Sequence, residues 1–248
     1  MDTERLEFLK KYIERHENHL DRYMGAMIDP AGKRILVLGA GWGTETYWAL
    51  KNGAEFVYGL DPAPRQIEPL LLALSAVSEE LVAKFEHTRA LIWEIPEEVE
   101  PFDAIISNNV VEHVFNLSAN LAACKRQIPK PGGRVHIFTD PLFYSSAGSH
   151  LPVAPWAHLI ESQASLLANL GTTRTNWSEY RHGLNGMTLT SFLEAVREAG
   201  MWIENMSVVP DRNRTHFNEL LDGMPSGLKP MDLLLEGISC TLAFPQNI

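Results

Sequence analysis

The feature that most constrains the fold is a short apolar run that ends in three alternating glycines. Ile35-Leu36-Val37-Leu38 leads into Gly39-Ala40-Gly41-Trp42-Gly43, and a helical pattern follows at 44–51. A continuous apolar run of this length is typical of a parallel strand that is buried on both faces. Glycines at such a turn let the chain bend sharply and let a ligand approach the bare backbone. A tight turn without a ligand would use the same residues, so the loop alone leaves both interpretations open.

A strand–helix rhythm runs from Arg34 to Asp140 and returns near the C-terminus. The expected strands lie at 35–38, 56–60, 84–91, 102–107, 134–139, about 202–209 and about 233–244, and the expected helices at 44–51, 65–82, 116–128 and 190–199. Alternating elements of these lengths imply parallel pairing through right-handed crossovers. We therefore predict an α/β fold, a doubly wound and mostly parallel seven-stranded sheet with helices on both faces.

Asp61 follows the second predicted strand, at a position where a carboxylate can bind a nucleotide. It can accept hydrogen bonds from both hydroxyls of a ribose, and it can also cap the helix that follows Pro62. Both roles can hold together. With the glycine loop, Asp61 predicts an adenosine-containing ligand at the carboxyl edge of the sheet. These two signals do not distinguish a nicotinamide cofactor from S-adenosylmethionine.

Two later segments do distinguish them. Ser107-Asn108-Asn109-Val110-Val111-Glu112-His113-Val114 follows the fourth predicted strand, and Lys130-Pro131-Gly132-Gly133 precedes the fifth. In this order and spacing they resemble the class I methyltransferases, particularly the small-molecule group with a V-x-E-H-V turn and a K-P-G-G hairpin. The resemblance covers roughly 34–140 and extends more weakly to 187–206. It implies S-adenosylmethionine as cofactor and methyl transfer to a small-molecule acceptor by in-line displacement.

The resemblance also implies roles for individual positions around the cofactor. The methionine portion would lie against Gly39, Ala40, Gly41 and Gly43, and the ribose would be held by Asp61. Adenine would have Pro62 and Gln66 near its edge and would be flanked by Ala90 and Leu91. The cofactor would also be faced by Asn108 and Asn109. One position departs from the family pattern. An acid usually stands just before the position of Ala90, and this chain has Arg89 there.

Catalytic residues vary within this family, because the methyl group is already activated and the protein mainly positions the acceptor. Where the acceptor is a hydroxyl or an ammonium group, histidine is the usual base. His150 is our first candidate and His113 our second. The candidate substrate contacts are Tyr144, Trp156, His158 and Arg181. His16 and His19 have no further ligands at suitable spacing, so we predict no metal site.

We interpret the chain as one domain with four parts. Residues 1–30 form an N-terminal helical segment, with a helix over 3–24, and 34–140 form the cofactor-binding core. Residues 141–187 form a substrate lid with one helix at about 156–170, and 188–248 supply the C-terminal helix and strands.

Charge and composition limit the classes of partner that we expect for this chain. The 248 residues carry a formal net charge of -10 and no basic run, which argues against nucleic acid. The chain has only two cysteines, Cys124 and Cys240, no apolar signal core at the start and no stretch long enough to span a bilayer. These features predict a cytoplasmic protein without a membrane partner. The oligomeric state is not predicted.

Two other functions share part of the pattern. An NAD(P)-dependent oxidoreductase would use the same glycine loop and Asp61, but the Tyr-x-x-x-Lys pair is missing: Tyr144 is followed by Gly148 and Tyr180 by Leu184. A catalytically silent domain that binds the cofactor as a sensor or partner subunit is the other alternative.

Overall fold

A seven-stranded sheet in the order β3-β2-β1-β4-β5-β7-β6 forms the centre of the protein. The computed structural model describes residues 3–63, 67–169, 183–224 and 226–245. The strands are β1 (Arg34–Leu38), β2 (Phe56–Leu60), β3 (Phe85–Thr88), β4 (Ala104–Asn108), β5 (Arg134–Thr139), β6 (Trp202–Pro210) and β7 (Leu235–Ala243). Strands β1 to β5 are parallel to one another. Strand β7 pairs antiparallel with both β5 and β6. The predicted doubly wound, mostly parallel sheet is confirmed.

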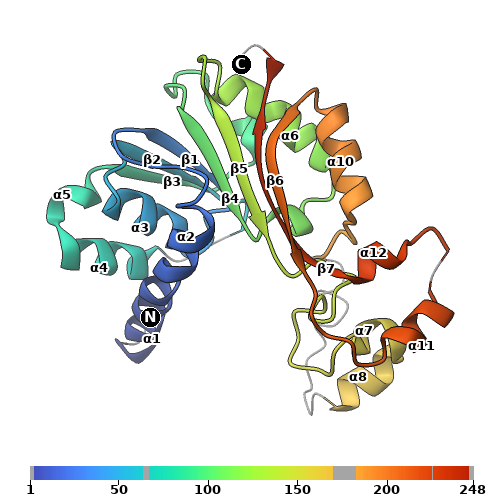
Figure 1. Ribbon diagram of the computed structural model, residues 1–248. Helices are drawn as coiled ribbons and strands as arrows, with labels where there is room; N and C mark the ends of the chain where they lie inside the picture. Colours follow the sequence, from blue (N-terminus) through green and yellow to red (C-terminus); the bar gives the residue numbers. More distant parts are fainter. Residues whose placement is uncertain (1–2, 64–66, 170–182, 225, 246–248) are drawn as a thin grey trace.

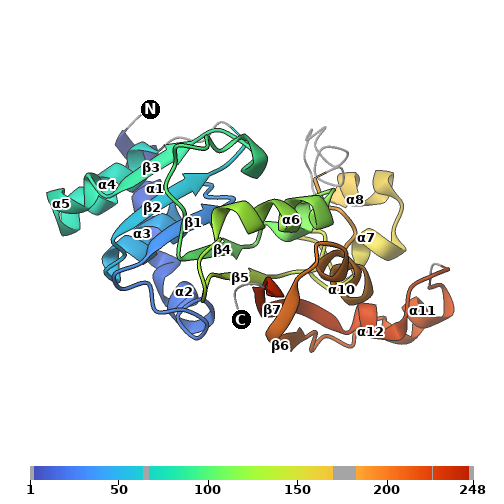
Figure 2. The same ribbon diagram turned by 90° about the horizontal axis from the view of Figure 1, so that it is seen from above.

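Helices cover both faces of the sheet (Figures 1 and 2). On one side lie α1 (Thr3–Arg15), α2 (Glu17–Tyr23), α3 (Thr44–Lys51), α4 (Glu68–Val77) and the short α5 (Glu79–Val82); on the other lie α6 (Leu117–Gln127) and α10 (Leu189–Glu198). Alternate residues of β1 enter different cores, since Leu36 packs with α6 and α10 whereas Ile35 and Val37 pack with α3 and α4. The continuous apolar run is therefore buried on both faces, as the sequence indicates.

A small group of short helices lies beyond the ends of β5, β6 and β7, at the lower right of Figure 1. It contains α7 (Ala157–Ile160), α8 (Gln163–Asn169), α11 (Phe217–Asp222) and α12 (Pro230–Leu233). A separate cluster of buried side chains, Trp156, Leu220 and Leu233, joins three of these segments. The predicted insertion after strand five thus packs against the segment between β6 and β7.

Several predicted boundaries are wrong for local reasons. The helix predicted over 3–24 divides at His16, whose ring Nδ1 donates to the Tyr12 carbonyl at 2.7 Å and so takes an acceptor that belongs to the helix backbone. The predicted strand at 84–91 ends at Thr88, and the helix predicted at 156–170 is two short helices with an extended residue, Glu161, between them.

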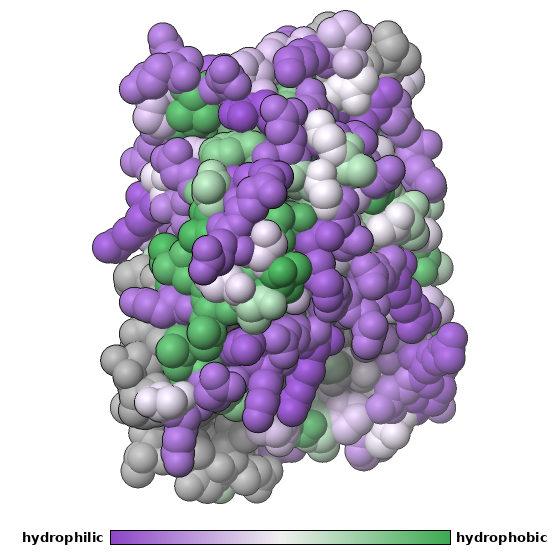
Figure 3. Space-filling model, turned by 90° about the vertical axis from the view of Figure 1, so that its left-hand side faces the viewer, coloured by the Kyte–Doolittle hydropathy of each residue, from purple (hydrophilic) through white to green (hydrophobic). Residues whose placement is uncertain are grey.

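The outer surface on the side of α4 and α5 is mixed in character. In Figure 3 apolar residues form a patch among hydrophilic ones. Among the described residues, Phe8 on α1 is 62% exposed and Val77 on α4 is 46% exposed. Helix α1 therefore packs along α4 with only part of its apolar surface covered.

Candidate active site

A cavity of about 560 Å³ opens at the carboxyl ends of β1, β2 and β4, within the size range of small-molecule sites. In an open α/β sheet, ligands bind outside the carboxyl ends where the strand order reverses, and here that point lies between β1 and β4. The lining comes from the loop after β1, the ends of β2 and β4, the chain after β3, and α1. The crossovers therefore bring together residues that are far apart in the sequence.

The three glycines after β1 meet different structural needs, although all have positive φ angles. A Cβ atom at Gly39 would lie 2.3 Å from Val110 Cγ2, and one at Gly43 would lie 2.5 Å from Leu70 Cδ2. These two glycines allow close packing. A Cβ atom at Gly41 would meet only the Gly39 carbonyl oxygen, at 3.9 Å. A side chain there would project into the open cavity, so Gly41 is the position at which bare backbone faces a ligand.

Asp61 connects the ends of β1 and β2. It is 7% exposed, and its Oδ2 accepts a hydrogen bond from the Gly41 amide at 2.9 Å while Oδ1 accepts one from the Ala63 amide at 2.8 Å. Asp61 also lines the cavity, where a carboxylate can accept hydrogen bonds from a ligand. Asp61 thus holds the glycine loop in place and presents an acceptor beside it.

The far end of the cavity is apolar, as expected for a site that holds an aromatic base. Ala90, Leu91 and Ile92 line it after β3, with Pro62 and Ala63 opposite after β2. Arg89, which replaces the usual acid, is exposed and donates from Nε to the Pro62 carbonyl at 3.1 Å. It therefore binds protein backbone at the rim. The predicted contact Gln66 lies outside the described residues.

Glu45 is a site residue that the sequence analysis did not include. It stands in the first turn of α3, is 5% exposed and lines the cavity. Its Oε2 accepts from the Thr44 hydroxyl at 2.6 Å, and its Oε1 accepts from Asn108 Nδ2 at 2.8 Å. Burial raises the pKa of this carboxyl. The available signal was an acid directly after the glycine loop, at the start of a helix.

Helix α1 and the residue that follows it supply a second group that was not among the predicted site residues. Tyr12 and His16 line the cavity together with the glycine loop. Their rings lie 4.1 Å apart between centroids. Burial, and then the charge of Glu45, raise the pKa of the Tyr12 hydroxyl. Sequence spacing predicts the helix but contains nothing that fixes where it docks.

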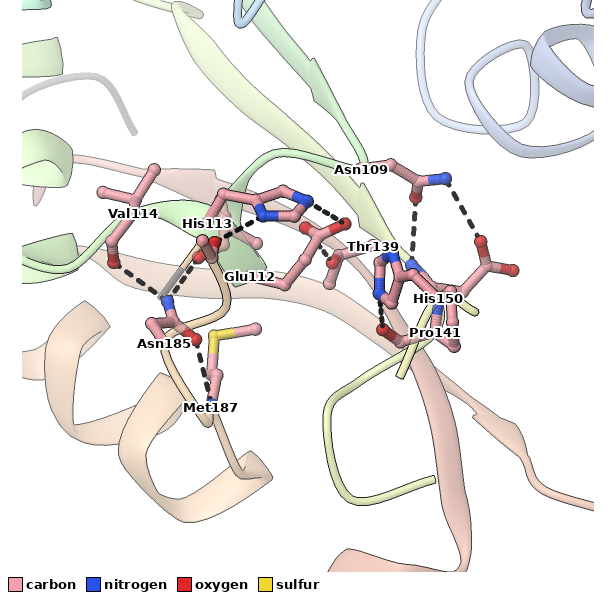
Figure 4. A network of polar contacts seen from close by, with 12 residues as sticks. Asn109, Glu112, His113, Val114, Thr139, Pro141, His150, Asn185 and Met187 are labelled. Carbon is pink, nitrogen blue, oxygen red and sulfur yellow. Dashed lines mark hydrogen bonds and ion pairs between the residues drawn. The ribbon is translucent and has the colours of Figure 1, made fainter. Parts of the chain in front are cut away.

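A polar network adjoins the cavity at the end of β4 and β5 (Figure 4). The Thr139 hydroxyl donates to Glu112 Oε2 at 2.5 Å, and Glu112 Oε1 lies 3.9 Å from His113 Nε2. His113 Nδ1 donates to the Gly183 carbonyl at 2.6 Å. In the neutral ring the lone pair is therefore on Nε2. His113 lines the cavity, so this nitrogen belongs to a candidate base.

His150 lies behind His113 and does not line the cavity. The two rings are 5.6 Å apart between centroids in an edge-to-face arrangement. His150 Nε2 donates to the Pro141 carbonyl at 2.9 Å, and burial lowers the pKa of the ring. The structure brings the two predicted catalytic histidines together but gives His113 the nearer position.

Asn109 and Asp140 extend this network toward β5. Asn109, with a positive φ of 54°, accepts from the Asp140 amide at 3.0 Å and donates to Asp140 Oδ1 at 3.3 Å. Burial raises the pKa of Asp140. Asn108 and Asn109 both line the cavity, as the resemblance implies.

Three of the four predicted substrate contacts are described by the structure, and none of these three lines the cavity. Trp156 is 0% exposed and packs near Phe217, so the prediction that it contacts substrate is wrong. His158 is buried and bonded through Nε2 to the Phe143 carbonyl at 2.6 Å, and Tyr144 packs against the cluster around Trp156. Arg181 lies outside the described residues. Of the described part of 141–187, Gly183 alone lines the cavity.

No three His, Cys, Asp or Glu side chains of the described residues are grouped so as to hold a metal ion. None of the helices in the described ranges is both long and apolar enough to cross a bilayer.

Comparison with known proteins finds a family match over part of the chain. A family profile described as "Methyltransferase domain" matches residues 36–135. "Ubiquinone biosynthesis O-methyltransferase" from Cereibacter sphaeroides is 34% identical over 133 residues, which are 54% of this chain and 50% of that protein. The human "Ubiquinone biosynthesis O-methyltransferase, mitochondrial" is 37% identical over 109 residues, 44% of this chain and 29% of that protein.

The chain thus spans about half the length, or less, of these curated relatives. A solved structure of an S-adenosylmethionine dependent methyltransferase from Mesorhizobium loti aligns with a TM-score of 0.54 and 19% identity, over 88% of this chain and 94% of that one. This likeness concerns the fold.

The Glu112 carboxyl gives the stability of the protein a predicted pH dependence. Burial raises its pKa from 4.5 to about 7. The folded protein therefore keeps this proton up to about pH 7, whereas the unfolded chain releases it near 4.5. The free energy of unfolding consequently falls as pH rises between these values, by roughly 1–3 kcal/mol for this group.

Glu112→Gln keeps an acceptor for Thr139 but removes the ionisation. Urea denaturation of both proteins from pH 4.5 to 8 should show the variant gaining stability relative to wild type as pH rises. A difference that stays constant over this range would contradict the prediction.

Proposed function

We propose that this protein transfers a methyl group from S-adenosylmethionine to a hydroxyl group of a small molecule. The match of residues 36–135 to a methyltransferase domain and the order of the seven strands support this proposal. The observation that carries it is the Gly41–Asp61 hydrogen bond at a cavity lined by both polar and apolar residues. The two relatives are O-methyltransferases by name, which supports oxygen as the methylated atom.

The cavity residues fit this cofactor. Gly41 would lie against the methionine portion, since a Cβ atom there would occupy open cavity. Asp61 would accept from the ribose hydroxyls, and the apolar walls at Ala90 and Leu91 would enclose adenine. When bound, S-adenosylmethionine supplies a methyl group that is already activated by a sulfonium, so the protein needs mainly to position and deprotonate the acceptor.

We assign the base to His113. Its Nδ1 hydrogen is held by the Gly183 carbonyl, which leaves Nε2 to accept the proton of an acceptor hydroxyl. The protonated ring would lie 3.9 Å from the Glu112 carboxyl. The His150 ring packs edge-to-face against the His113 ring.

We propose that residues 141–187 form the segment that covers the acceptor. The cytoplasmic location is a prediction from the sequence.

Replacing Gly41 by Val should abolish binding of S-adenosylhomocysteine, because the new side chain would fill the ligand's place. Gly132→Val is the matched control: Gly132 also has a positive φ angle, of 83°, but no atom lies within 4 Å of its Cβ position. Both variants should lose similar stability, and only Gly41→Val should lose binding in isothermal titration calorimetry. Equal affinity in the two variants would show that the ligand lies elsewhere.

Replacing His113 by Ala should lower turnover about 100-fold or more while S-adenosylhomocysteine still binds, because the base is lost and the cofactor contacts remain. Turnover can be followed as S-adenosylhomocysteine release with a panel of small phenols and alcohols. His150→Ala should have a much smaller effect, since that ring lies outside the cavity.

If His150→Ala lowered turnover more than His113→Ala, His150 would be the base. Cofactor binding without methyl transfer to any acceptor of the panel or of a cell extract would favour the catalytically silent alternative.

A further inference from the structure

A short segment just before α10 lies against the turn that carries His113 (Figure 4). We call this segment, residues 183–187, the strap. The turn is η2 (Val111–His113), a single 3₁₀ turn after β4. Strap and turn are about seventy residues apart in the sequence. Two buried apolar side chains, Leu184 and Met187, anchor the strap.

Asn185 binds the strap to the turn. Its backbone amide donates to the Glu112 carbonyl at 2.8 Å. Its side-chain Nδ2 donates to the Val111 carbonyl at 2.7 Å and to the Val114 carbonyl at 2.9 Å. Its Oδ1 accepts from the Met187 amide at 2.9 Å. Asn185 thus binds backbone carbonyls on both sides of the candidate base and uses every polar group of its side chain.

The turn needs these donors because it is short. The last carbonyls of a helical turn have no partner within it. In η2 the chain is already extended at Val114. The carbonyls of Glu112 and Val114 therefore need donors from outside the turn, and Asn185 supplies both.

The strap also sets the state of the His113 ring. The Gly183 carbonyl accepts from His113 Nδ1 at 2.6 Å, and Gly183 stands two residues before Asn185. The His113 side chain is 42% exposed, so packing alone leaves much of it uncovered. In a neutral histidine, the hydrogen bond that one ring nitrogen makes decides which nitrogen carries the proton. The attachment of the strap therefore places the acceptor that holds this proton on Nδ1.

We propose that Asn185 is a positioning residue for the base. By tying the strap to the turn, it holds the Gly183 carbonyl at His113 Nδ1 and keeps Nε2 as the nitrogen that accepts a proton. Asn185 does not itself line the cavity, so it acts through His113. Its effect on turnover rests on the proposed function, whereas its effect on the ring does not.

The tautomer of His113 can be measured without any ligand. Long-range ¹H–¹⁵N correlation spectra distinguish protonated from unprotonated ring nitrogens, and His113→Ala identifies the signals. At about pH 8, where a histidine ring is ordinarily neutral, wild-type His113 should carry its proton on Nδ1. Asn185→Ala should give a mixture of the two tautomers. A proton on Nε2 in the wild type would overturn the assignment before any variant of Asn185 is made.

Two further variants isolate the donor of Asn185. Asn185→Asp keeps an acceptor for the Met187 amide but removes Nδ2, so its tautomer mixture should match that of Asn185→Ala. Asn213→Ala is the matched control. Asn213 Oδ1 accepts from the Thr215 amide at 2.9 Å, the same two-residue turn, but it lies in the segment between β6 and α11. This variant should keep the wild-type tautomer, and thermal unfolding verifies that each variant is folded.

Turnover connects the ring to the reaction. Asn185→Ala should lower the rate of S-adenosylhomocysteine release about tenfold or more, because the base is no longer held in place, while the affinity for S-adenosylhomocysteine is unchanged. Asn213→Ala should retain full turnover.

The outcomes separate this inference from the proposed function. The Nδ1 tautomer unchanged in folded Asn185→Ala would contradict the role of Asn185 alone. A changed tautomer with full turnover would show that His113 is not the base. A changed tautomer in a protein whose wild type transfers no methyl group would contradict the proposed function and leave the positioning of the ring intact.

Discussion

The hydrogen bond from the Gly41 amide to Asp61 is the contact on which the geometry of the site depends. It joins the loop after β1 to the end of β2, two strands that are paired in register from Arg34 and Phe56 to Leu38 and Leu60. The strand pairing places the two loops side by side, and the carboxylate then sets their separation. One carboxylate thereby holds the glycine loop in place and lines the cavity, so the structural role of Asp61 coincides with the binding role that we propose for it.

Buried or partly buried acids lie in the cavity wall or beside it in this protein of net charge -10: Glu45 lines the cavity, and Glu112 and Asp140 belong to the adjoining polar network. Burial raises the pKa of Glu45, of Glu112 and of Asp140, and each contacts an uncharged donor: a hydroxyl or an amide group. Such a wall suits a ligand that brings positive charge. S-adenosylmethionine carries a sulfonium and an ammonium, and we infer that the acids are retained for this electrostatic match at some cost in stability.

The cofactor half of the site could be predicted from sequence because its residues directly follow strands. Gly39, Asp61 and Asn108 stand at the ends of β1, β2 and β4, and parallel strands place such positions at one edge. The acceptor half could not be predicted in this way. Trp156 follows β5 in the chain, yet it packs into a small core with Leu220 and Phe217, more than fifty residues later. His158 is buried and bonded to the Phe143 carbonyl. This long-range packing produces no periodic pattern in the sequence near Trp156. The docking of α1, which brings Tyr12 to the cavity, likewise produces no pattern in the sequence.

The central claim is that the backbone after β1 and the carboxylate after β2 bind opposite ends of one sulfonium nucleoside. A crystal structure of the complex with S-adenosylhomocysteine tests it most directly. The account predicts the ribose hydroxyls within hydrogen-bond distance of Asp61 and the homocysteine chain across Gly41. A complex in which the nucleoside lies away from the carboxyl edge of β1 and β2 would contradict it.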